Sequence, residues 1–175
     1  MEKGLVHIYH GNGKGKTTAA VGLCTRAAGS GLQVLFVQFL KDGTSGELRT
    51  LRGMHGVRIL KGAPVEGFLK DKEHDVRAAT GLEHRARFAE ARRMVEEGAF
   101  DLVVFDEAMA TMNLGLLPVE TMTDFLDHRP VGLEVVLTGR RPPKAILDRA
   151  DYISEIRCVR HPYQKGIDAR KGIEW

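Results

Sequence analysis

Residues 5–28, LVHIYHGNGKGKTTAAVGLCTRAA, decide the fold class. The short β-branched run at 5–9 predicts a buried strand, and the Ala-rich run at 17–28 predicts a helix that ends before a Gly-Ser-Gly sequence. The Gly-rich stretch between them predicts a loop whose successive N–H groups face one concavity and hold an anion. Free N–H groups and the dipole of the following helix add to the positive field. The stretch therefore predicts a strand–loop–helix unit that binds phosphate.

Two side chains at the end of this loop fit a nucleotide and its metal ion. Lys16 is placed to bring an ammonium group to the outer phosphates, and the hydroxyl of Thr17 is suited to ligate Mg²⁺. A Gly-rich turn with incidental lysines is the alternative, but it leaves the order of strand, loop, Gly-Lys-Thr and helix unexplained. The common pattern GxxxxGK(S/T) has glycine where this chain has His10, so the loop predicts phosphate binding and leaves hydrolysis open. The candidate nucleotide-binding residues of the loop are Gly11, Asn12, Gly13, Lys14, Gly15, Lys16, Thr17 and Thr18.

Beyond the loop, apolar runs alternate with helical patterns. The runs at 32–39, 57–60, 102–105, 133–137 and 152–159 predict strands, and those at 82–97, 119–126 and 144–150 predict helices. This alternation predicts an α/β fold with a mostly parallel sheet and helices on both of its faces. The stretch 41–73 is rich in Gly and Lys and predicts mainly loops and short elements above the sheet. We therefore expect one domain over residues 1–175, with a loop-rich cover at about 41–80.

Composition and charge exclude several classes of protein. Lys and Arg number 26 and Asp and Glu 23, and the net charge of +3 is too small for a protein that coats nucleic acid or an anionic membrane. No apolar run approaches about 18 residues, so no membrane span is expected, and the first residues do not resemble a signal peptide. Cys24 and Cys158 lie far apart without metal-ligand spacing, which favours a reducing compartment. We expect a cytoplasmic protein with neither nucleic-acid nor membrane partners.

An acidic pair follows one of the predicted strands. Asp106 and Glu107 come directly after the apolar run 102–105. In folds with a phosphate loop, a carboxylate at this place lies beside the loop and holds Mg²⁺ directly or through water. A surface Asp-Glu pair is the alternative when such a pair occurs alone. A carboxylate of this pair is therefore a candidate metal ligand beside Thr17, while Glu107 as a base that activates water would equally suit an ATPase.

Several motifs, taken in order, resemble one enzyme family. GNGKGKTTAA at 11–20 and VQFLK at 37–41 are followed by Asp106-Glu107, TGR at 138–140 and VRHPY at 159–163. With GIEW at 172–175, they resemble the ATP:corrinoid adenosyltransferases, the family of the cob(I)yrinic acid a,c-diamide and cob(I)alamin adenosyltransferases. The resemblance covers nearly the whole chain, at family-like spacing.

This resemblance implies a RecA-like P-loop fold, usually as a homodimer, that uses ATP, Mg²⁺ and a reduced corrinoid. The Co(I) centre attacks C5′ of ATP, the 5′-deoxyadenosyl group is transferred, and triphosphate leaves. An electron-donating reductase supplies Co(I). The substrate is cobyrinic acid a,c-diamide, cobinamide or cobalamin, in synthesis or salvage of adenosylcobalamin. The resemblance places Thr17 and Glu107 at Mg²⁺, and we take Lys16 and Glu107 as the candidate catalytic residues. It also places Arg26 at the nucleotide, with a solvent-facing side chain as the alternative, and Arg140 at nucleotide or corrinoid.

The chain departs from the family in the lobe that covers the corrinoid. Family members often carry Gly-Phe-x-Trp there, and this chain has Gly67-Phe68-Leu69-Lys70. Phe68 is therefore the candidate corrinoid-binding residue, as an apolar wedge that keeps water from the cobalt. Simple packing of the lobe onto the sheet is the alternative role. Lys70 at the Trp position leaves open how the lower cobalt ligand is displaced.

Two other functions compete with adenosyl transfer. A P-loop nucleotide hydrolase or kinase would use the same loop to give ADP, with Glu107 positioning water or an acceptor. A regulatory module would bind nucleotide or corrinoid without turnover. The absence of an acceptor-site signature and the departure at His10 weigh against the first, and the small net charge weighs against a nucleic-acid version of the second.

Overall fold

The computed structural model describes residues 2–41, 43–60, 74–98 and 100–174. The strands are β1 (Val6–His10), β2 (Val34–Gln38), β3 (Val57–Leu60), β4 (Leu102–Asp106), β5 (Glu134–Gly139) and β6 (Tyr152–Glu155). The helices are α1 (Lys16–Gly29), α2 (Gly46–Arg52), α3 (His74–Glu96), α4 (Ala108–Asn113), α5 (Val119–His128) and α6 (Lys144–Leu147), followed by a 3₁₀ turn at Pro162–Lys165.

The six strands form one sheet in the order β3-β2-β4-β5-β1-β6. Every neighbouring pair is parallel, so all carboxyl ends lie at the same edge. β2 and β4 are buried along their whole length, which explains their near-continuous apolar sequence. The loops that follow the strands therefore gather at one edge of the sheet, where ligands bind in open α/β folds.

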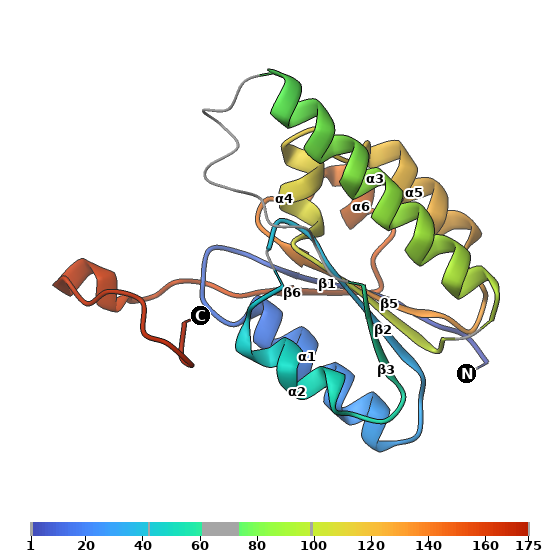
Figure 1. The fold of residues 1–175 in the computed structure, drawn as a ribbon, viewed down its shortest axis with the longest axis horizontal. Coiled ribbons are helices and arrows are strands. Elements are labelled where there is room, and N and C mark those ends of the chain that lie inside the picture. The colour runs from blue at the N-terminus through green and yellow to red at the C-terminus, as the bar shows by residue number, and fades with distance from the viewer. Residues whose placement is uncertain (1, 42, 61–73, 99, 175) are drawn as a thin grey trace.

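Helices cover both faces of the sheet. Figure 1 shows α1 and α2 on one face and α3, α4, α5 and α6 on the other. Between the sheet and α3–α6 lies a large apolar cluster in which Phe88, Phe105 and Phe125 meet with ring centroids 5.5–5.6 Å apart. A smaller cluster on the other face joins Cys24 of α1 to the sheet. These two layers hold the carboxyl edge in place.

One polar group lies inside the larger layer. His84 of α3 is fully buried, and its ring meets that of Phe39 edge-on at 5.6 Å. The guanidinium of Arg87 lies 3.0 Å from Nδ1 of His84 and also donates to the carbonyl oxygen of Gln38. Because an arginine only donates, Nδ1 must accept, so the ring proton is on Nε2. Burial, and the charge of Arg87, lower the pKa of His84 to about 4, and the ring is neutral at pH 7.

The expected α/β fold with a parallel sheet covered on both faces is confirmed. The last predicted strand, 152–159, is wrong beyond β6, because residues from Ile156 onward turn against the phosphate loop. α3 begins at residue 74, earlier than predicted, and α4 was not expected. Within the described ranges no helix is long and apolar enough to cross a membrane.

The expected loop-rich cover at about 41–80 is only partly described. Residues 46–52 and 57–60 belong to the layers of the fold as α2 and β3, and residues 74–80 begin α3. Leu48 and Leu51 of α2 are fully buried against the sheet, which explains why this part is not a loop. Residues 61–73, with Phe68, lie outside the described residues.

Candidate active site at the carboxyl edge of the sheet

The phosphate loop connects β1 to α1. Gly11 and Gly15 have φ angles of 113° and 118°, which side-chain-bearing residues rarely adopt. Gly15 is the residue before α1, and Lys16 and Thr17 form the first turn of the helix. The Lys16 ammonium folds back over the loop and donates to the Gly13 carbonyl oxygen at 2.7 Å. The loop is therefore closed by its own lysine in this structure.

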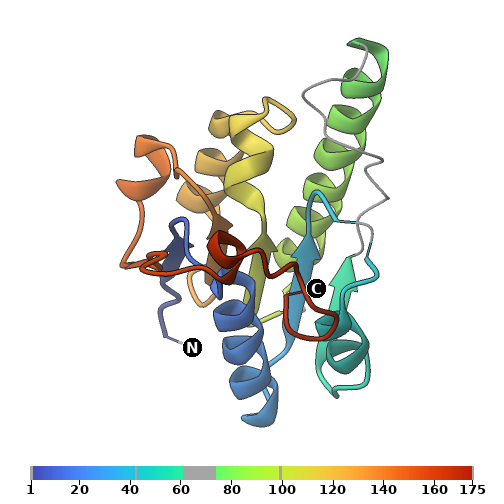
Figure 2. The ribbon, with the colours of Figure 1, turned by 90° about the vertical axis from the view of Figure 1, so that its left-hand side faces the viewer.

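The segment after β6 packs against the other side of the loop, and Figure 2 shows it crossing in front of the start of α1. The Gly13 amide donates to the Ile156 carbonyl oxygen at 2.8 Å, and the Cys158 amide donates to Oδ1 of Asn12 at 2.9 Å. A Cβ atom on Gly13 would lie 2.7 Å from the carbonyl carbon of Arg157. This glycine thus makes room for the neighbouring segment, and its N–H points there instead of toward a phosphate.

A buried carboxylate links α1 to three strands. Asp106, at the end of β4, is fully buried. Its Oδ1 accepts hydrogen bonds from the hydroxyls of Thr17 at 2.8 Å and Thr138 at 2.7 Å. Its Oδ2 accepts from the ammonium of Lys41 at 2.8 Å, and more weakly from Nε2 of Gln38 at 3.5 Å. These contacts satisfy a buried charge that would otherwise be costly.

Glu107 stands beside this carboxylate and precedes α4. Its backbone is left-handed, with φ 61°, and its N–H donates to the Thr138 hydroxyl at 3.0 Å. Burial, and then the charge of Asp106, raise the pKa of Glu107, whereas Lys41, Lys16 and Arg140 lower it by smaller amounts. Burial lowers the pKa of Lys16, with Arg140 acting in the same sense. Cations from three elements thus surround one acidic pair.

Three adjacent strands end in unusual backbone. Leu40 after β2, Glu107 after β4 and Arg141 after β5 all have φ between 54° and 61°. Such conformations cost non-glycine residues about 1–3 kcal/mol and cluster at functional sites. The turn at Leu40 precedes Lys41, whose ammonium lies 3.3 Å from the Thr17 hydroxyl oxygen.

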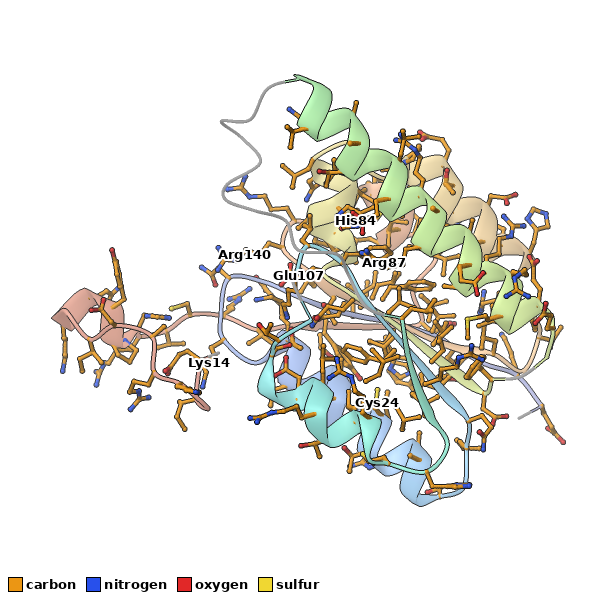
Figure 3. All side chains as sticks on the ribbon, in the orientation of Figure 1. Lys14, Cys24, His84, Arg87, Glu107 and Arg140 are labelled. Carbon is orange, nitrogen blue, oxygen red and sulfur yellow. The ribbon has the colours of Figure 1, made fainter. Side chains whose placement is uncertain are left out.

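A groove of about 590 Å³ opens beside the loop. Its lining includes His10, Asn12, Arg140, Arg141 and Arg157. Figure 3 shows the labelled side chains of Lys14, Glu107 and Arg140 at this same end of the molecule. A groove with three arginines in its lining is suited to an anionic ligand.

The structure gathers most, but not all, of the candidate residues. Lys16, Thr17, Glu107 and Arg140 meet at the carboxyl edge. Asn12 and Thr18 are exposed beside them, and the exposed Lys14 ammonium lies 3.9 Å from Oε1 of Glu174. Arg26 is not brought to the loop.

Arg26 lies in the last turn of α1 and is exposed to solvent. It lies nine positions after Thr17, which corresponds to about 14 Å along a helix. The nucleotide-binding role predicted for it has no support in this geometry.

Lys41, Gln38 and Thr138 are site residues to which sequence reasoning gave no role. Each stands at or just after the carboxyl end of a predicted strand. The rule that parallel strands present these ends at one edge was the available signal. What it could not give was their common partner, the carboxylate of Asp106.

The residues present fit a hydrated Mg²⁺ ion. Within the described ranges no group of three or more His, Cys, Asp or Glu side chains is placed to hold a metal. Mg²⁺ does not need such a cage, because it keeps several waters and shares phosphate oxygens with one or two protein ligands. Oε1 of the fully buried Gln38 has no hydrogen-bond partner. Its Nε2 faces Asp106, so the free oxygen is left to accept from a metal-bound water.

The sequence matches the family model of the ATP:corrinoid adenosyltransferases BtuR/CobO/CobP over residues 2–175. It is 37% identical over 174 residues to the corrinoid adenosyltransferase of Escherichia coli (strain K12), covering 99% of this chain and 87% of that protein. The same identity and coverage relate it to the corrinoid adenosyltransferase CobA of Salmonella typhimurium (strain LT2). The corrinoid adenosyltransferase of Pseudomonas aeruginosa is 30% identical, covering 99% and 85%.

Solved structures support the fold. The cytoplasmic domain of EssC aligns with a TM-score of 0.56 at 15% identity, over 96% of this chain and 34% of that one. ATPases 2 and 3 of Thermomonospora curvata EccC align with a TM-score of 0.53 at 20% identity, over 93% of this chain and 33% of that one. This chain thus spans about a third of those chains, and at such identities the likeness shows the P-loop ATPase fold alone. The family model and the relatives, which agree over almost the whole chain, show that the protein belongs to the ATP:corrinoid adenosyltransferase family and transfers the adenosyl group of ATP to a corrinoid.

Proposed function

We propose that the protein joins the 5′-deoxyadenosyl group of ATP to the Co(I) centre of its corrinoid and releases triphosphate. The cobalt–carbon bond forms with an electron pair of Co(I). The C5′–O bond breaks, and its pair leaves on the triphosphate. No proton moves, so the reaction needs no base. The cations Lys16 and Arg140, whose charges act on Glu107 at the end of β4, support this reaction, because they provide charge stabilisation for a leaving anion.

The leaving group sets the main demand on the protein. Negative charge grows on the triphosphate oxygen as the C5′–O bond breaks. Lys16 and the N–H groups at the start of α1 stabilise that charge, and preorganised donors of this kind dominate many enzymatic rate enhancements. Holding C5′ in line with the cobalt supplies the rest. In this proposal the loop of residues 11–18 binds the triphosphate, with the N–H of Gly13 held by Ile156 instead, and Arg140 binds a phosphate from the groove side.

Mg²⁺ is part of the proposal. Thr17 would hold it through its hydroxyl and Glu107 through its carboxylate. Bound Mg²⁺ neutralises phosphate charge and orients the triphosphate. The chain's own residues prepare this place, since the Thr17 hydroxyl donates its hydrogen bond to Asp106 and its oxygen faces a cation, here the ammonium of Lys41 at 3.3 Å. Gln38 offers its unpaired oxygen to the hydration shell.

The corrinoid and its reduction concern residues that the structure does not describe. We keep Phe68 as the corrinoid-binding residue and an electron-donating reductase as the source of Co(I). Replacing Phe68 by Ala should slow adenosylation that starts from Co(II) corrinoid more than adenosylation from chemically reduced Co(I). Equal losses in both assays would limit Phe68 to packing.

We also propose a homodimer in the reducing cytoplasm. The segment after β6 carries large apolar side chains in solvent, with Val159 96% and Tyr163 72% exposed. Exposed apolar groups of this kind are typical of surfaces that bind another protein. Both cysteines are free, as a reducing compartment requires. Light scattering coupled to size exclusion, on the wild type and on Val159→Ser, tests the dimer.

The reaction is tested under anaerobic conditions. Purified protein is mixed with MgATP and chemically reduced cobyrinic acid a,c-diamide, cobinamide or cobalamin, and phosphate products are separated by ion exchange. A light-sensitive alkyl-cobalt product with one equivalent of triphosphate is expected, and relative rates identify the preferred corrinoid. ADP and phosphate released regardless of corrinoid would instead favour a hydrolase with Glu107 as its base.

A further inference from the structure

Lys41 lies in the phosphate site without belonging to the phosphate loop. It follows β2, and the left-handed backbone of Leu40 turns the chain just before it. Its ammonium lies 2.8 Å from Oδ2 of Asp106 and 3.3 Å from the hydroxyl oxygen of Thr17. One cation thus bridges the carboxylate of Asp106 and the hydroxyl of Thr17, which is one of the two proposed metal ligands.

This placement differs from an ordinary surface ion pair. Asp106 is fully buried, whereas the Lys41 side chain is 30% exposed, so the ammonium stands at the boundary between the core and the site. Oδ1 of Asp106 is already satisfied by two hydroxyls, Thr17 and Thr138. The carboxylate therefore holds its hydroxyl partners even when the ammonium moves away.

Lys41 also acts on the same groups as the phosphate-loop lysine. Lys16 and Lys41 both oppose the negative charge of Glu107, although they come from α1 and the end of β2. The charges of Lys16 and Lys41 also act on each other. Because the Lys41 ammonium also lies 3.3 Å from the Thr17 hydroxyl oxygen, a phosphate that reaches Lys16 and the metal at Thr17 lies within reach of Lys41.

We propose that Lys41 is a further catalytic residue: without nucleotide its ammonium takes the cation position between Thr17 and Asp106, and with MgATP bound it turns onto the departing triphosphate. This inference rests on the proposed triphosphate-releasing reaction. When MgATP binds, the metal ion would thus replace the ammonium beside Thr17, and the ammonium would move to the triphosphate. A second ammonium adds to Lys16 in stabilising charge on the leaving group.

The competing role for Lys41 is purely structural. In that case it neutralises buried Asp106 and never meets ATP. The single variant Lys41→Met does not separate the two roles, because it leaves a buried carboxylate without its charge partner and the chain can fail to fold.

A double-mutant cycle with Asp106 separates them. The four proteins are wild type, Lys41→Met, Asp106→Asn and Lys41→Met/Asp106→Asn, with Lys41→Arg as the conservative variant. Lys144→Met is the matched control, because that lysine pairs with Asp148 at the exposed end of α6. Circular dichroism gives the folded fraction, and kcat and KM for ATP are measured with reduced cobalamin.

In the Asp106→Asn background the buried carboxylate that Lys41 contacts directly is gone. Removing Lys41 there should still lower kcat by tenfold or more, and by about 10²-fold in the wild-type background, as for loss of one charge-stabilising donor. Lys41→Arg should recover part of that loss, and Lys144→Met should match wild type. A change below threefold between Asp106→Asn and the double variant would overturn the proposal.

Metal binding gives an independent readout. If Lys41 occupies the cation position, Mn²⁺ added alone should bind weakly to the wild type and at least tenfold more tightly to Lys41→Met, as followed by electron paramagnetic resonance. Equal affinities would contradict the exchange. A wild type that forms no triphosphate from ATP and Co(I) corrinoid would refute the proposed reaction itself, whereas an active wild type with an unaffected double variant would refute only the role of Lys41.

Discussion

The hydroxyl of Thr17 and the carboxylate of Asp106 are joined by a 2.8 Å hydrogen bond, although 89 positions separate them in sequence. The bond ties the first turn of α1 to the end of β4, across the loop that is proposed to hold triphosphate. It also fixes the direction of the Thr17 proton, toward the core. The hydroxyl oxygen is thereby left to face a cation.

Removal of the Lys16 ammonium from the phosphate loop should strongly reduce the rate of adenosylation. We expect Lys16→Ala to lower kcat for adenosylation by about 10²–10³-fold, because it removes charge stabilisation from the leaving triphosphate. The rate is followed by loss of Co(I) absorbance under anaerobic conditions, with Lys144→Ala as control. Turnover near that of the wild type would refute the role of the loop.

Alanine substitutions at Gly13 and Gly15 of the loop should have different structural effects. Gly13→Ala places a methyl group against the backbone of Ile156 and Arg157, and overpacking of this kind costs about 1–3 kcal/mol. Gly15 has open space around it, so Gly15→Ala strains only the φ angle of 118°. Limited proteolysis should therefore release the segment after β6 from Gly13→Ala but not from Gly15→Ala. Identical cleavage patterns would mean that Gly13 does not hold that segment.

The protein should become less stable as the pH falls, because His84 is buried in its neutral form. Its pKa is about 4 in the folded protein and near 6.5 when unfolded, so between these pH values the unfolded chain binds a proton that the folded chain does not. The free energy of unfolding should therefore decrease by about 3 kcal/mol as pH falls from 6.5 to 4. Urea titrations of wild type and His84→Leu measure this, and the variant should show a smaller decrease. The exposed His55→Leu should behave as wild type, and a slope unchanged in His84→Leu would contradict the assignment.

Removal of the metal should stop triphosphate release. With excess EDTA we expect at least a tenfold loss, restored by Mg²⁺, because the phosphate charges are then not neutralised. Glu107→Gln should raise the Mg²⁺ concentration for half-maximal rate about tenfold, a typical effect of a weakened metal site. Glu120→Gln, on the exposed side of α5, serves as control. An unchanged Mg²⁺ requirement in Glu107→Gln would remove Glu107 from the metal site.

The fold was accessible from sequence because its signals are local. The buried strands β2 and β4 are continuous apolar runs, and the Gly-rich motif between β1 and α1 identifies the phosphate loop. The six-residue helix α4 gave no such signal, since a segment that short shows no clear period. The end of the last strand was also misplaced, because Ile156 remains apolar after it has left the sheet.

The site was only partly accessible. Lys16, Thr17 and Glu107 were predicted as site residues because they belong to short motifs with a known chemical role. The ion pair of Lys41 with Asp106 depends on the pairing of β2 with β4, and no sequence spacing reports a strand order. Sequence spacing also does not show that the N–H of Gly13 donates a hydrogen bond to the segment after β6. Such contacts arise from topology and become visible only in three dimensions.

The position of β1 between β5 and β6 has a consequence for biosynthesis. The strand that carries the phosphate loop is translated before both of its partners, β5 and β6, which follow it by more than 120 residues. A ribosome-bound nascent chain therefore cannot complete the nucleotide site until about residue 158 has left the exit tunnel. Products terminated before that point should carry the loop motif without the two strands that pair with β1, and thus without a complete nucleotide site.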